Sequence, residues 1–303
     1  MGGPEQLLAS LGGSAAASDM RRYFSQRQLE RAVLGGGVVR PRNGVYALAS
    51  LDEAHRVALE CRGVLFARSA ALAHGLGVLE RPRAVDVAVR RGTKIRAHPQ
   101  ANIVTRLLPE EDLVRVGVVT ATSPVRTVLD CAAQLEFAEG LAVADSALRC
   151  GLVTGSQLTS AAEAWIGRNK RALRRVLAHM DGRAANPFES GLRAACLEAG
   201  VALEPQLRIS TRGGTFVVDL GSALYRVTAE ADSFEWHGGR EALHRDCTRY
   251  NELVRDQWTV LRFSWEHVMF DRAWVGQVVA DVIRGSKRHN SRGRNAKTVH
   301  SAA

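Results

Sequence analysis

The sequence contains no apolar run that could cross a membrane and no clear export signal. None of its 303 residues lies in an uncharged apolar stretch of about 18 to 20 residues, the length that a membrane helix needs. The opening segment, MGGPEQLLASLGGSAAASDMRR, has no positive residue before its short apolar run, unlike a secretory signal peptide. We therefore expect neither a membrane partner nor secretion.

The sequence also lacks cysteines arranged for cross-linking or for binding a metal. Its five cysteines are odd in number, widely spaced and never part of a CxxC pair: Cys61, Cys131, Cys150, Cys196 and Cys247. This spacing argues against a disulfide framework and against a zinc site. Free thiols suit a reducing compartment, so the sequence predicts a cytoplasmic protein.

The carboxy-terminal segment 285–303 has no acidic residue but contains five lysines and arginines. The formal net charge of the whole chain is +10, with a pI of about 10.0, so this segment carries half of the excess. A basic chain favours a polyanion such as DNA as its partner, although many basic proteins bind nothing specific. Because Ser, Gly and Asn separate these charges without apolar periodicity, the segment is predicted to be a disordered basic tail.

Residues 1–50 have the element order of a winged helix-turn-helix. The stretches GPEQLLASLGG and SDMRRYFSQRQLERAVLGGG are each typical of a helix closed by glycine. Ser25 is suited to cap the later helix, with Gln28 three residues on as its capping-box partner. Two β-rich runs follow, joined by Asn43-Gly44, a strong signal for a hairpin turn.

In a winged helix-turn-helix, the second helix reads DNA and the basic hairpin, or wing, can lie against the phosphate backbone. This arrangement makes Gln28 and Arg31 candidate DNA-binding residues on the recognition helix. Arg40 and Arg42 are the corresponding candidates on the wing. The alternative is a small structural domain whose basic hairpin is merely solvated.

Residues 51–182 mix helices and strands, and we find no catalytic constellation in them. Apolar spacing predicts helices at 53–65 and 69–77 and over SPVRTVLDCAAQL, AEGLAVADSALRCGLV and SQLTSAAEAWIG, while AVDVAVRRG alternates as a strand. His74, Asp130 and Asp145 lie on largely apolar helices, so we expect them to pack, cap or pair.

Several strings in the first two segments resemble bacterial AbiEi-type proteins. They are GVYAL, SAALAHGL, VDVAV followed by RRG, TSPVRTVLDCA and ADSALRCGLV, and the resemblance spans residues 20–180. AbiEi-type proteins are winged-helix antitoxins and transcriptional regulators of abortive-infection systems. The resemblance implies DNA binding through the winged helix, and a cognate toxin or another defence partner.

Residues 186–284 are predicted to form a further domain with the order α-β-β-β-α-β-α. Asn186 is suited as the N-cap of its first helix, with Pro187 at the first helical position, Glu189 at the third and Gly200 at the end. The predicted strands are LEPQLRIS, TFVVDLGS, YRVTAEAD and WTVLRFSW, and the later helices span 241–256 and 272–283.

Three acidic residues fall on neighbouring strands of this domain. Asp219 ends the apolar run FVVDL, and Glu230 and Asp232 are two apart on the next strand, which places both on one face. A hairpin about residues 222–224 would put Asp219 opposite Glu230. Like charges in a buried sheet repel each other unless a cation offsets them, and Mg²⁺ (or Mn²⁺) is the natural choice for oxygen ligands. Such an ion could activate water for attack on a phosphodiester.

Each of these acids also has a purely structural interpretation. Single acids at strand ends are usually solvated, and edge strands carry acidic pairs such as Glu230 with Asp232. Glu189, as the third residue of a helix, is fully explained by capping.

The same residues carry a second resemblance. An Asp at a strand end followed by Glu-x-Asp in the next strand resembles the core of PD-(D/E)XK nucleases, in which the last position is more often Lys. The pieces FESGLR, VVDLG, VTAEADSFEWHG and HRDCTRYNELVRDQWTVLRFSWE resemble a small bacterial family related to very-short-patch-repair endonucleases. The zinc-binding cysteines of the repair enzymes are absent, so mismatch specificity is not implied.

The resemblance implies a role for each matching position. Asp219 and Glu230 would be metal ligands, and Asp232 stands where the Lys usually is. His237 would act as an acid/base or water-positioning residue, and Glu189 would complete the site. Supporting roles fall on three further residues, of which the last could replace the charge of the missing Lys: Asp246, Arg249 and Arg262.

The sequence therefore predicts an α+β multidomain protein with four parts. These are a winged helix-turn-helix (1–50), an AbiEi-like mixed α/β middle domain (51–182), a restriction-endonuclease-like domain (186–284) and a disordered tail (285–303). The first functional hypothesis is a Mg²⁺-dependent DNA endonuclease in phage defence or DNA repair. The alternative is a non-enzymatic DNA-binding regulator or antitoxin with a degenerate nuclease-like domain. The clustered acids favour the enzyme, since a binding module has no need of them.

Overall fold

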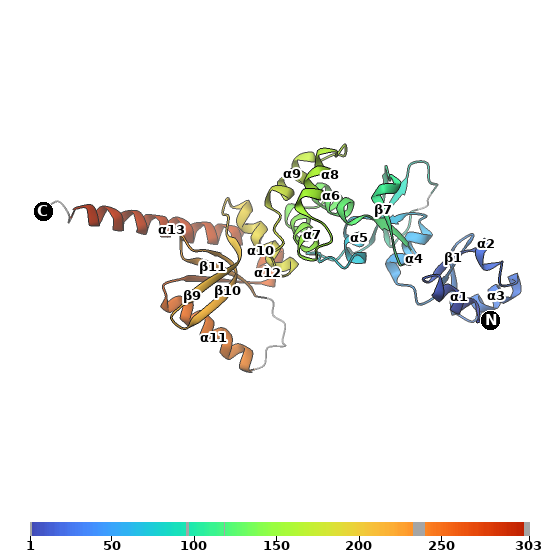
Figure 1. Ribbon diagram of the computed structural model, residues 1–303, viewed down its shortest axis with the longest axis horizontal. Coiled ribbons are helices and arrows are strands. Elements are labelled where there is room, and N and C mark those ends of the chain that lie inside the picture. Colours follow the sequence, from blue (N-terminus) through green and yellow to red (C-terminus); the bar gives the residue numbers. More distant parts are fainter. Residues whose placement is uncertain (1, 95–96, 118, 233–239, 300–303) are drawn as a thin grey trace. The chain divides into compact units, whose positions relative to one another are not determined.

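The computed structural model of the protein describes residues 2–94, 97–117, 119–232 and 240–299 (Figure 1). The chain is a mixed α+β protein with two compact units. Unit 1 comprises Met1–Ala133 with Ser156–Ile166, and unit 2 comprises Gln134–Gly155 with Gly167–Ala303. The boundary predicted between residues 182 and 186 falls inside unit 2, and the boundary predicted at residue 50 falls inside unit 1.

The first part of unit 1 is a three-stranded sheet with three helices. Its elements are α1 (Pro4–Ser10), β1 (Ser14–Ala16), α2 (Ala17–Met20), α3 (Gln26–Leu34), β2 (Val38–Arg42) and β3 (Val45–Leu48), with strand order β1-β3-β2. The predicted capping box of Ser25 and Gln28 is present at the start of α3. The predicted Asn43-Gly44 turn joins β2 to β3, with Gly44 at a φ of 81° that glycine adopts without strain.

The second part of unit 1 is a five-stranded sheet of order β6-β5-β4-β8-β7. The strands are β4 (Val64–Leu65), β5 (Val85–Arg90), β6 (Ala101–Arg106), β7 (Leu113–Val116) and β8 (Val119–Thr122). The helices are α4 (Glu53–Glu60), α5 (Ala67–Ala73), the short 3₁₀ helix η1 (Glu110–Asp112), α6 (Pro124–Gln134) and α8 (Gly155–Glu163). Val57 of α4 packs on Leu65, Val87 and Ala121 of the sheet, which gives this part its own core.

Unit 2 contains a four-stranded sheet of order β12-β11-β10-β9, in which only β11 and β12 run parallel among the described strands. Its strands are β9 (Glu204–Thr211), β10 (Gly214–Ser222), β11 (Val227–Asp232) and β12 (Thr259–Ser264). Its helices are α7 (Phe137–Arg149), α9 (Lys170–His179), α10 (Pro187–Glu198), α11 (Arg240–Arg255), α12 (Trp265–Phe270) and α13 (Arg272–Val299).

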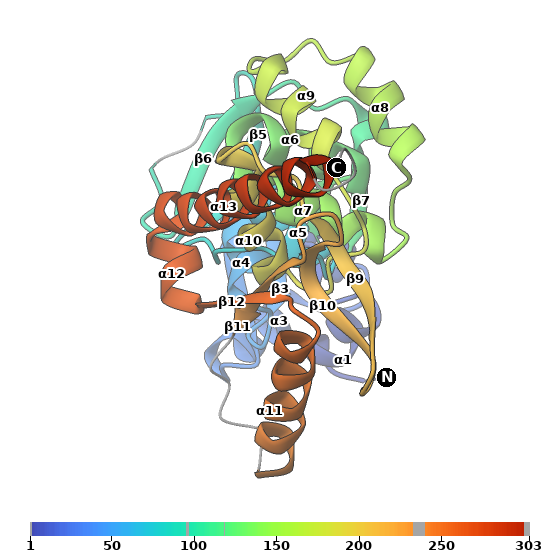
Figure 2. The same ribbon diagram turned by 90° about the vertical axis from the view of Figure 1, so that its left-hand side faces the viewer.

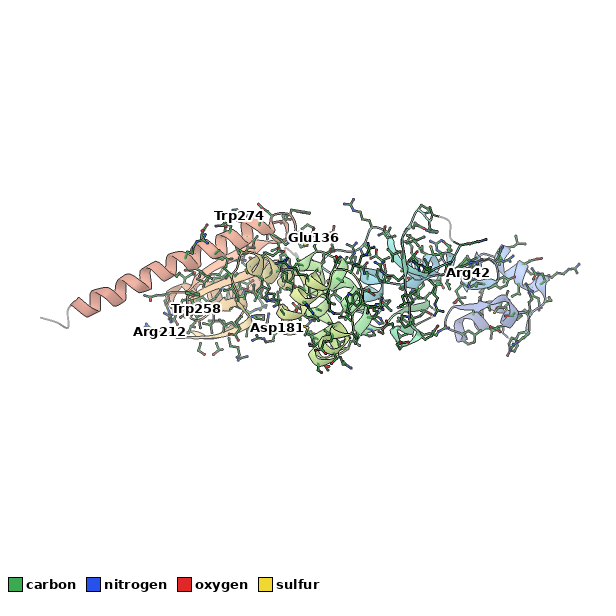
Figure 3. All side chains as sticks on the ribbon, turned by 90° about the horizontal axis from the view of Figure 1, so that it is seen from above. Arg42, Glu136, Asp181, Arg212, Trp258 and Trp274 are labelled. Atoms are coloured by element: carbon green, nitrogen blue, oxygen red, sulfur yellow. The ribbon has the colours of Figure 1, made fainter. Side chains whose placement is uncertain are left out.

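Helices cover both faces of this sheet (Figure 2). Leu192 of α10 and Val275 of α13 pack with Leu220 of β10 on one side. Leu253 of α11 packs on the other side with Trp258, which is labelled in Figure 3. The predicted element order from residue 186 is confirmed through β12, but the single closing helix is replaced by α12 and α13.

The tail predicted to be disordered from residue 285 instead continues α13 to Val299. The prediction relied on the missing apolar periodicity, which decides whether a helix packs and not whether it forms. Extending an existing helix needs no new nucleus, and Lys, Arg and Ala have high helix propensity. The backbone can therefore stay helical without an apolar face.

A buried ion pair joins α7 to α10 within unit 2. Asp145 accepts a hydrogen bond of 2.5 Å from the guanidinium of Arg193, and both side chains are almost fully buried. The Asp145 carboxylate also accepts from Ser190 Oγ at 2.8 Å and from the Asp181 backbone N–H at 2.7 Å. The pairing role predicted for Asp145 is confirmed, and the network links α7, predicted as part of the middle domain, to α10.

The two other polar residues on apolar helices are also satisfied locally. Asp130 accepts a hydrogen bond of 2.9 Å from Nε of Arg126, one turn earlier on α6. His74 is the C-cap residue of α5, and its Nε2 lies 2.7 Å from the carbonyl oxygen of Thr122. Both have the structural roles that were predicted for them.

Candidate functional site

Asp219 and Glu230 face each other across the hairpin of β10 and β11. The described register pairs Leu220 with Ala229 and Gly221 with Thr228, and extending it by one step would set Asp219 opposite Glu230. Directly opposed residues of an antiparallel pair share a face of the sheet and have Cβ atoms about 4.5–5.5 Å apart. Asp219 Oδ2 also accepts a hydrogen bond of 2.8 Å from the backbone N–H of Ala231. This hydrogen bond places the Asp219 carboxylate beside the strand that carries Glu230.

Glu230 is a buried carboxylate whose hydrogen-bonding capacity is only partly used by the groups around it. The residue is only 3% exposed, and Oε1 has no hydrogen-bond partner in the described part of the chain. Oε2 lies 3.4 Å from a guanidinium nitrogen of Arg249 on α11. Burial and, to a smaller extent, the Asp219 carboxylate raise the pKa of Glu230 to about 7, with Arg249 partly offsetting both effects. The pKa of Asp219 is also raised, mainly by burial.

The raised pKa of Glu230 predicts a loss of folding stability as the pH rises. The folded chain holds its proton up to about pH 7, whereas the unfolded chain releases it near 4.5, so deprotonation between these values favours unfolding. In the presence of a chelator, the free energy of unfolding of wild type should fall by about 1–3 kcal/mol between these pH values. Glu230→Gln should lack this part of the pH dependence.

Urea denaturation at several pH values checks this prediction. Glu204→Gln is the matched control, because Glu204 lies at the exposed start of β9 and pairs with Arg183. The free energy of unfolding of this control should depend on pH with the same slope as that of wild type. If the free energy of unfolding had the same pH dependence in Glu230→Gln and wild type, Glu230 would not be the group that titrates.

Glu189 approaches the same pair from the start of α10. Its carboxylate accepts hydrogen bonds from the Ala185 N–H at 2.8 Å, from the Asn186 side chain at 2.9 Å and from the Gln206 amide at 2.8 Å. Burial raises its pKa, the hydrogen bond from Ala185 lowers it in part, and the negative charge of Asp219 raises it again. The predicted caps are also present, since the Asn186 side chain accepts from the Glu189 N–H.

Gln206 is a residue of this site that sequence reasoning missed. It adopts a φ of 53°, a left-handed conformation that costs a non-glycine residue of order 1 kcal/mol. The β9–β10 pairing passes from Leu207–Val218 to Pro205–Leu220 and leaves out Gln206 and Asp219 between them. The strained backbone aims the Gln206 amide at Glu189 next to Asp219, and no sequence signal marks a glutamine for such a role.

Asp232 is held differently from the other acids. It receives a hydrogen bond of 2.6 Å from Nε of Arg262, on the parallel strand β12. The guanidiniums of Arg262 and Arg249 lie 4.3 Å and 4.7 Å from the centre of the Tyr250 ring, and Arg249 also donates to the Tyr250 hydroxyl at 2.8 Å. Arg249 lies 3.7 Å from Asp246, one turn earlier. The residues expected to support the site therefore do surround it, and Tyr250 joins them.

The acids do not form a ready-made set of three metal ligands. Within the described residues, no group of three His, Cys, Asp or Glu side chains is placed to hold one ion. Asp232 is turned to Arg262, and the Glu189 carboxylate accepts hydrogen bonds from three protein donors. His237 lies outside the described residues. Asp219 and Glu230 are the two predicted ligands that the register brings together.

The candidate DNA-binding residues of unit 1 have distinct surroundings. Gln28 and Arg31 are exposed on α3, but the side-chain oxygen of Gln28 accepts bonds from Ser25 N at 2.8 Å and Ser25 Oγ at 2.9 Å. Arg40 is exposed, with its guanidinium 5.4 Å from the centre of the Tyr46 ring. Arg42 (labelled in Figure 3) is half-buried and lines a cavity. No helix in the described part of the chain combines the length and apolarity needed to span a membrane.

No protein-family model matches the chain. It is 30% identical over 269 residues to two Mycobacterium tuberculosis proteins, "Uncharacterized protein MT2308" of strain CDC 1551 and "Uncharacterized protein Rv2248" of strain H37Rv, across 86% of this chain and 97% of each relative. The crystal structure of the RV2827C protein from M. tuberculosis matches 61% of this chain and 78% of its own, with a TM-score of 0.37 and 10% identity. That last similarity is too low to carry an argument.

Proposed function

We propose that this chain, which belongs to the same family as the M. tuberculosis proteins MT2308 and Rv2248, is a metal-dependent DNA endonuclease whose amino-terminal domain binds DNA. One observation carries the proposal: a buried carboxylate, Glu230, faces a second carboxylate across a hairpin and retains an oxygen with no hydrogen-bond partner among the described residues. Buried acids are normally paired and satisfied, so this arrangement calls for a cation.

The residues present fit a hard divalent cation. Asp219 and Glu230 supply only oxygen atoms, which Mg²⁺ and Mn²⁺ prefer as ligands. Arg249 is the described cation nearest to Glu230, and at 3.4 Å it satisfies one carboxylate oxygen and leaves the other. The two negative charges therefore exceed the positive charge beside them. Mg²⁺ usually keeps several of its waters and takes one or two protein carboxylates, so two ligands are enough.

A divalent ion held by Asp219 and Glu230 would supply an activated water and would stabilise the charge that develops on a phosphodiester. The chain's own residues do the rest. Arg249 of α11 holds Glu230 in place, and Arg249 is itself fixed by its hydrogen bond to the Tyr250 hydroxyl. Arg262 lies on β12, and its side chain is half-exposed. It can therefore offer positive charge to a phosphate in place of the missing Lys. Asp232 fixes the position of Arg262 through their hydrogen bond.

The first test of the site is a metal-induced shift of the melting temperature. A ligand that binds only the folded state stabilises it by about 2.7 kcal/mol at a hundred times its Kd. Millimolar Mg²⁺ or Mn²⁺ should therefore raise the melting temperature of wild type by several degrees and that of Asp219→Asn by much less. Glu204→Gln, on the same sheet, should respond like wild type. Equal shifts in wild type and Asp219→Asn would remove the metal from the proposal.

A second candidate function is a DNA-binding regulator that cuts nothing. The observation in its favour is that Asp232 and Glu189 are already satisfied by protein donors, so the acids could serve structure alone. A toxin partner would belong to this second function. Cleavage of plasmid, mismatched or single-stranded DNA in the presence of Mg²⁺ or Mn²⁺ separates the two functions.

A further inference from the structure

Three arginines line a single cavity in unit 1. The cavity has a volume of about 360 Å³ and lies among β1, β2, the end of α4, β7 and β8. Arg42, Arg62 and Arg115 reach it from three separate elements, and its remaining lining is mostly small and apolar, including Ala16, Ala58 and others. Its volume falls at the lower end of the range of small-ligand sites, about 300–1,000 Å³.

Arg62 occupies a backbone position that favours glycine. It follows the C-cap of α4 with a φ of 54°, and the Arg62 N–H bonds to the Leu59 carbonyl while the Gly63 N–H bonds to the Ala58 carbonyl. This is a Schellman motif, in which the left-handed residue is usually glycine. Gly63 cannot carry a side chain, because a Cβ there would lie 2.3 Å from Val87. Glycine would end the helix at this position without strain. The arginine side chain at residue 62 is therefore not required to terminate α4.

The charged side chains that line the cavity are all positive among the described residues. None of the described residues that line it is acidic. Burial lowers the pKa of Arg42, and the positive charge of Arg62 lowers this pKa further. The Nε atom of Arg42 is buried without a hydrogen-bond partner among the described residues. Like charges brought together in a concave site repel one another and concentrate a potential that attracts anions.

We propose that this cavity is a phosphate-binding site, in which Arg42, Arg62 and Arg115 hold a phosphate group against an apolar floor. Arginine suits this role because its planar fork of donors matches phosphate oxygens. The proposal does not rest on the carboxylates of unit 2 or on cleavage. The phosphate can come from a free nucleotide-sized molecule or from the DNA backbone, and the two sources share this chemistry.

The decisive variant is Arg62→Gly. Glycine adopts the left-handed conformation without strain, so the variant should melt at or above the temperature of wild type. Its affinity for phosphate ligands should nevertheless fall at least about tenfold, because a charge-assisted contact is lost. Arg115→Ala, at an exposed position of β7, should give the same loss independently. Arg91→Ala removes an equal charge from an exposed residue outside the cavity and should bind like wild type.

Binding of the full chain is measured without divalent metal to inorganic phosphate, to adenosine monophosphate and to a short DNA duplex. If Arg62→Gly loses affinity for inorganic phosphate and adenosine monophosphate, a free phosphorylated molecule is the source. If Arg62→Gly loses affinity for the duplex alone, the DNA backbone is the source of the phosphate. The proposal is overturned if wild type binds none of the three, if Arg62→Gly and Arg115→Ala bind as tightly as wild type, or if Arg91→Ala loses as much affinity. Glu230→Gln should bind all three normally, so these outcomes are independent of the nuclease proposal.

Discussion

Glu230→Gln is expected to reduce metal-dependent DNA cleavage at least about a thousandfold while leaving DNA affinity nearly unchanged. A bound metal contributes several kcal/mol to the stabilisation of the transition state, and about 4 kcal/mol corresponds to three orders of magnitude in rate. The glutamine keeps the size of the side chain and can still accept from Arg249, so the fold should be preserved. Removing a negative charge near the phosphate should, if anything, tighten binding slightly.

The complementary variant separates binding from chemistry. Arg31→Ala with Arg40→Ala should weaken affinity at every DNA sequence and lower its salt dependence, since fewer phosphate contacts release fewer counterions. At saturating DNA, the same double variant should cleave like wild type. Both arginines are exposed and lie outside the cavity of Arg62, so their effect is distinct from that of Arg62→Gly.

Two outcomes would count against the nuclease. Cleavage that survives Glu230→Gln would point to a contaminating enzyme and defeat the mechanism. Tight binding to a promoter-like site, with no cleavage under any divalent metal and no effect of Glu230→Gln, would identify a regulator. In that case a repression assay on the protein's own promoter should respond to the arginine variants of unit 1 alone.

Arg193→Ala is expected to destabilise unit 2 by about 3–5 kcal/mol, the cost of removing one partner from a buried ion pair. The loss leaves the Asp145 carboxylate buried with only Ser190 and a backbone N–H as donors. It also frees the carbonyl oxygen of His179, to which Arg193 donates. Denaturation in urea measures the effect directly.

An exposed ion pair supplies the control for Arg193. Arg212 (labelled in Figure 3) lies 4.0 Å from Asp256, and its side chain is 84% exposed. Arg212→Ala should therefore cost no more than about 1 kcal/mol. If both variants lost the same stability, the network of Asp145 would not be the element that joins α7 to α10. Asp145→Asn with Arg193→Met should recover part of the loss, because no charge is then left unpaired.

Local signals in the sequence predicted much of the architecture. The capping box of Ser25, the Asn43-Gly44 turn and the Asn186-Pro187 start of α10 all occur where they were predicted. Each depends on hydrogen bonds and backbone angles within a few residues, which the residue types themselves decide. The opposition of Asp219 and Glu230 was also predictable, because a hairpin converts spacing along the chain into register across it.

The tertiary structure alone decided the surroundings of these groups. Sequence spacing could not show that Arg193 of α10 would pair with Asp145 of α7, 48 residues away. Nor could it show that Asp232 would turn to Arg262, or that Arg42 would face Arg62 and Arg115 across a cavity.

The sequence by itself therefore determined the element order and the pairing of two carboxylates across one hairpin. These follow from local interactions, whose partners lie within one turn or one hairpin of each other. Only the tertiary structure decided which charges are satisfied, which oxygen of Glu230 is left without a partner and which arginines share a cavity. The physical reason is that burial and electrostatic compensation depend on every element packed around a group, and those elements come from distant parts of the chain.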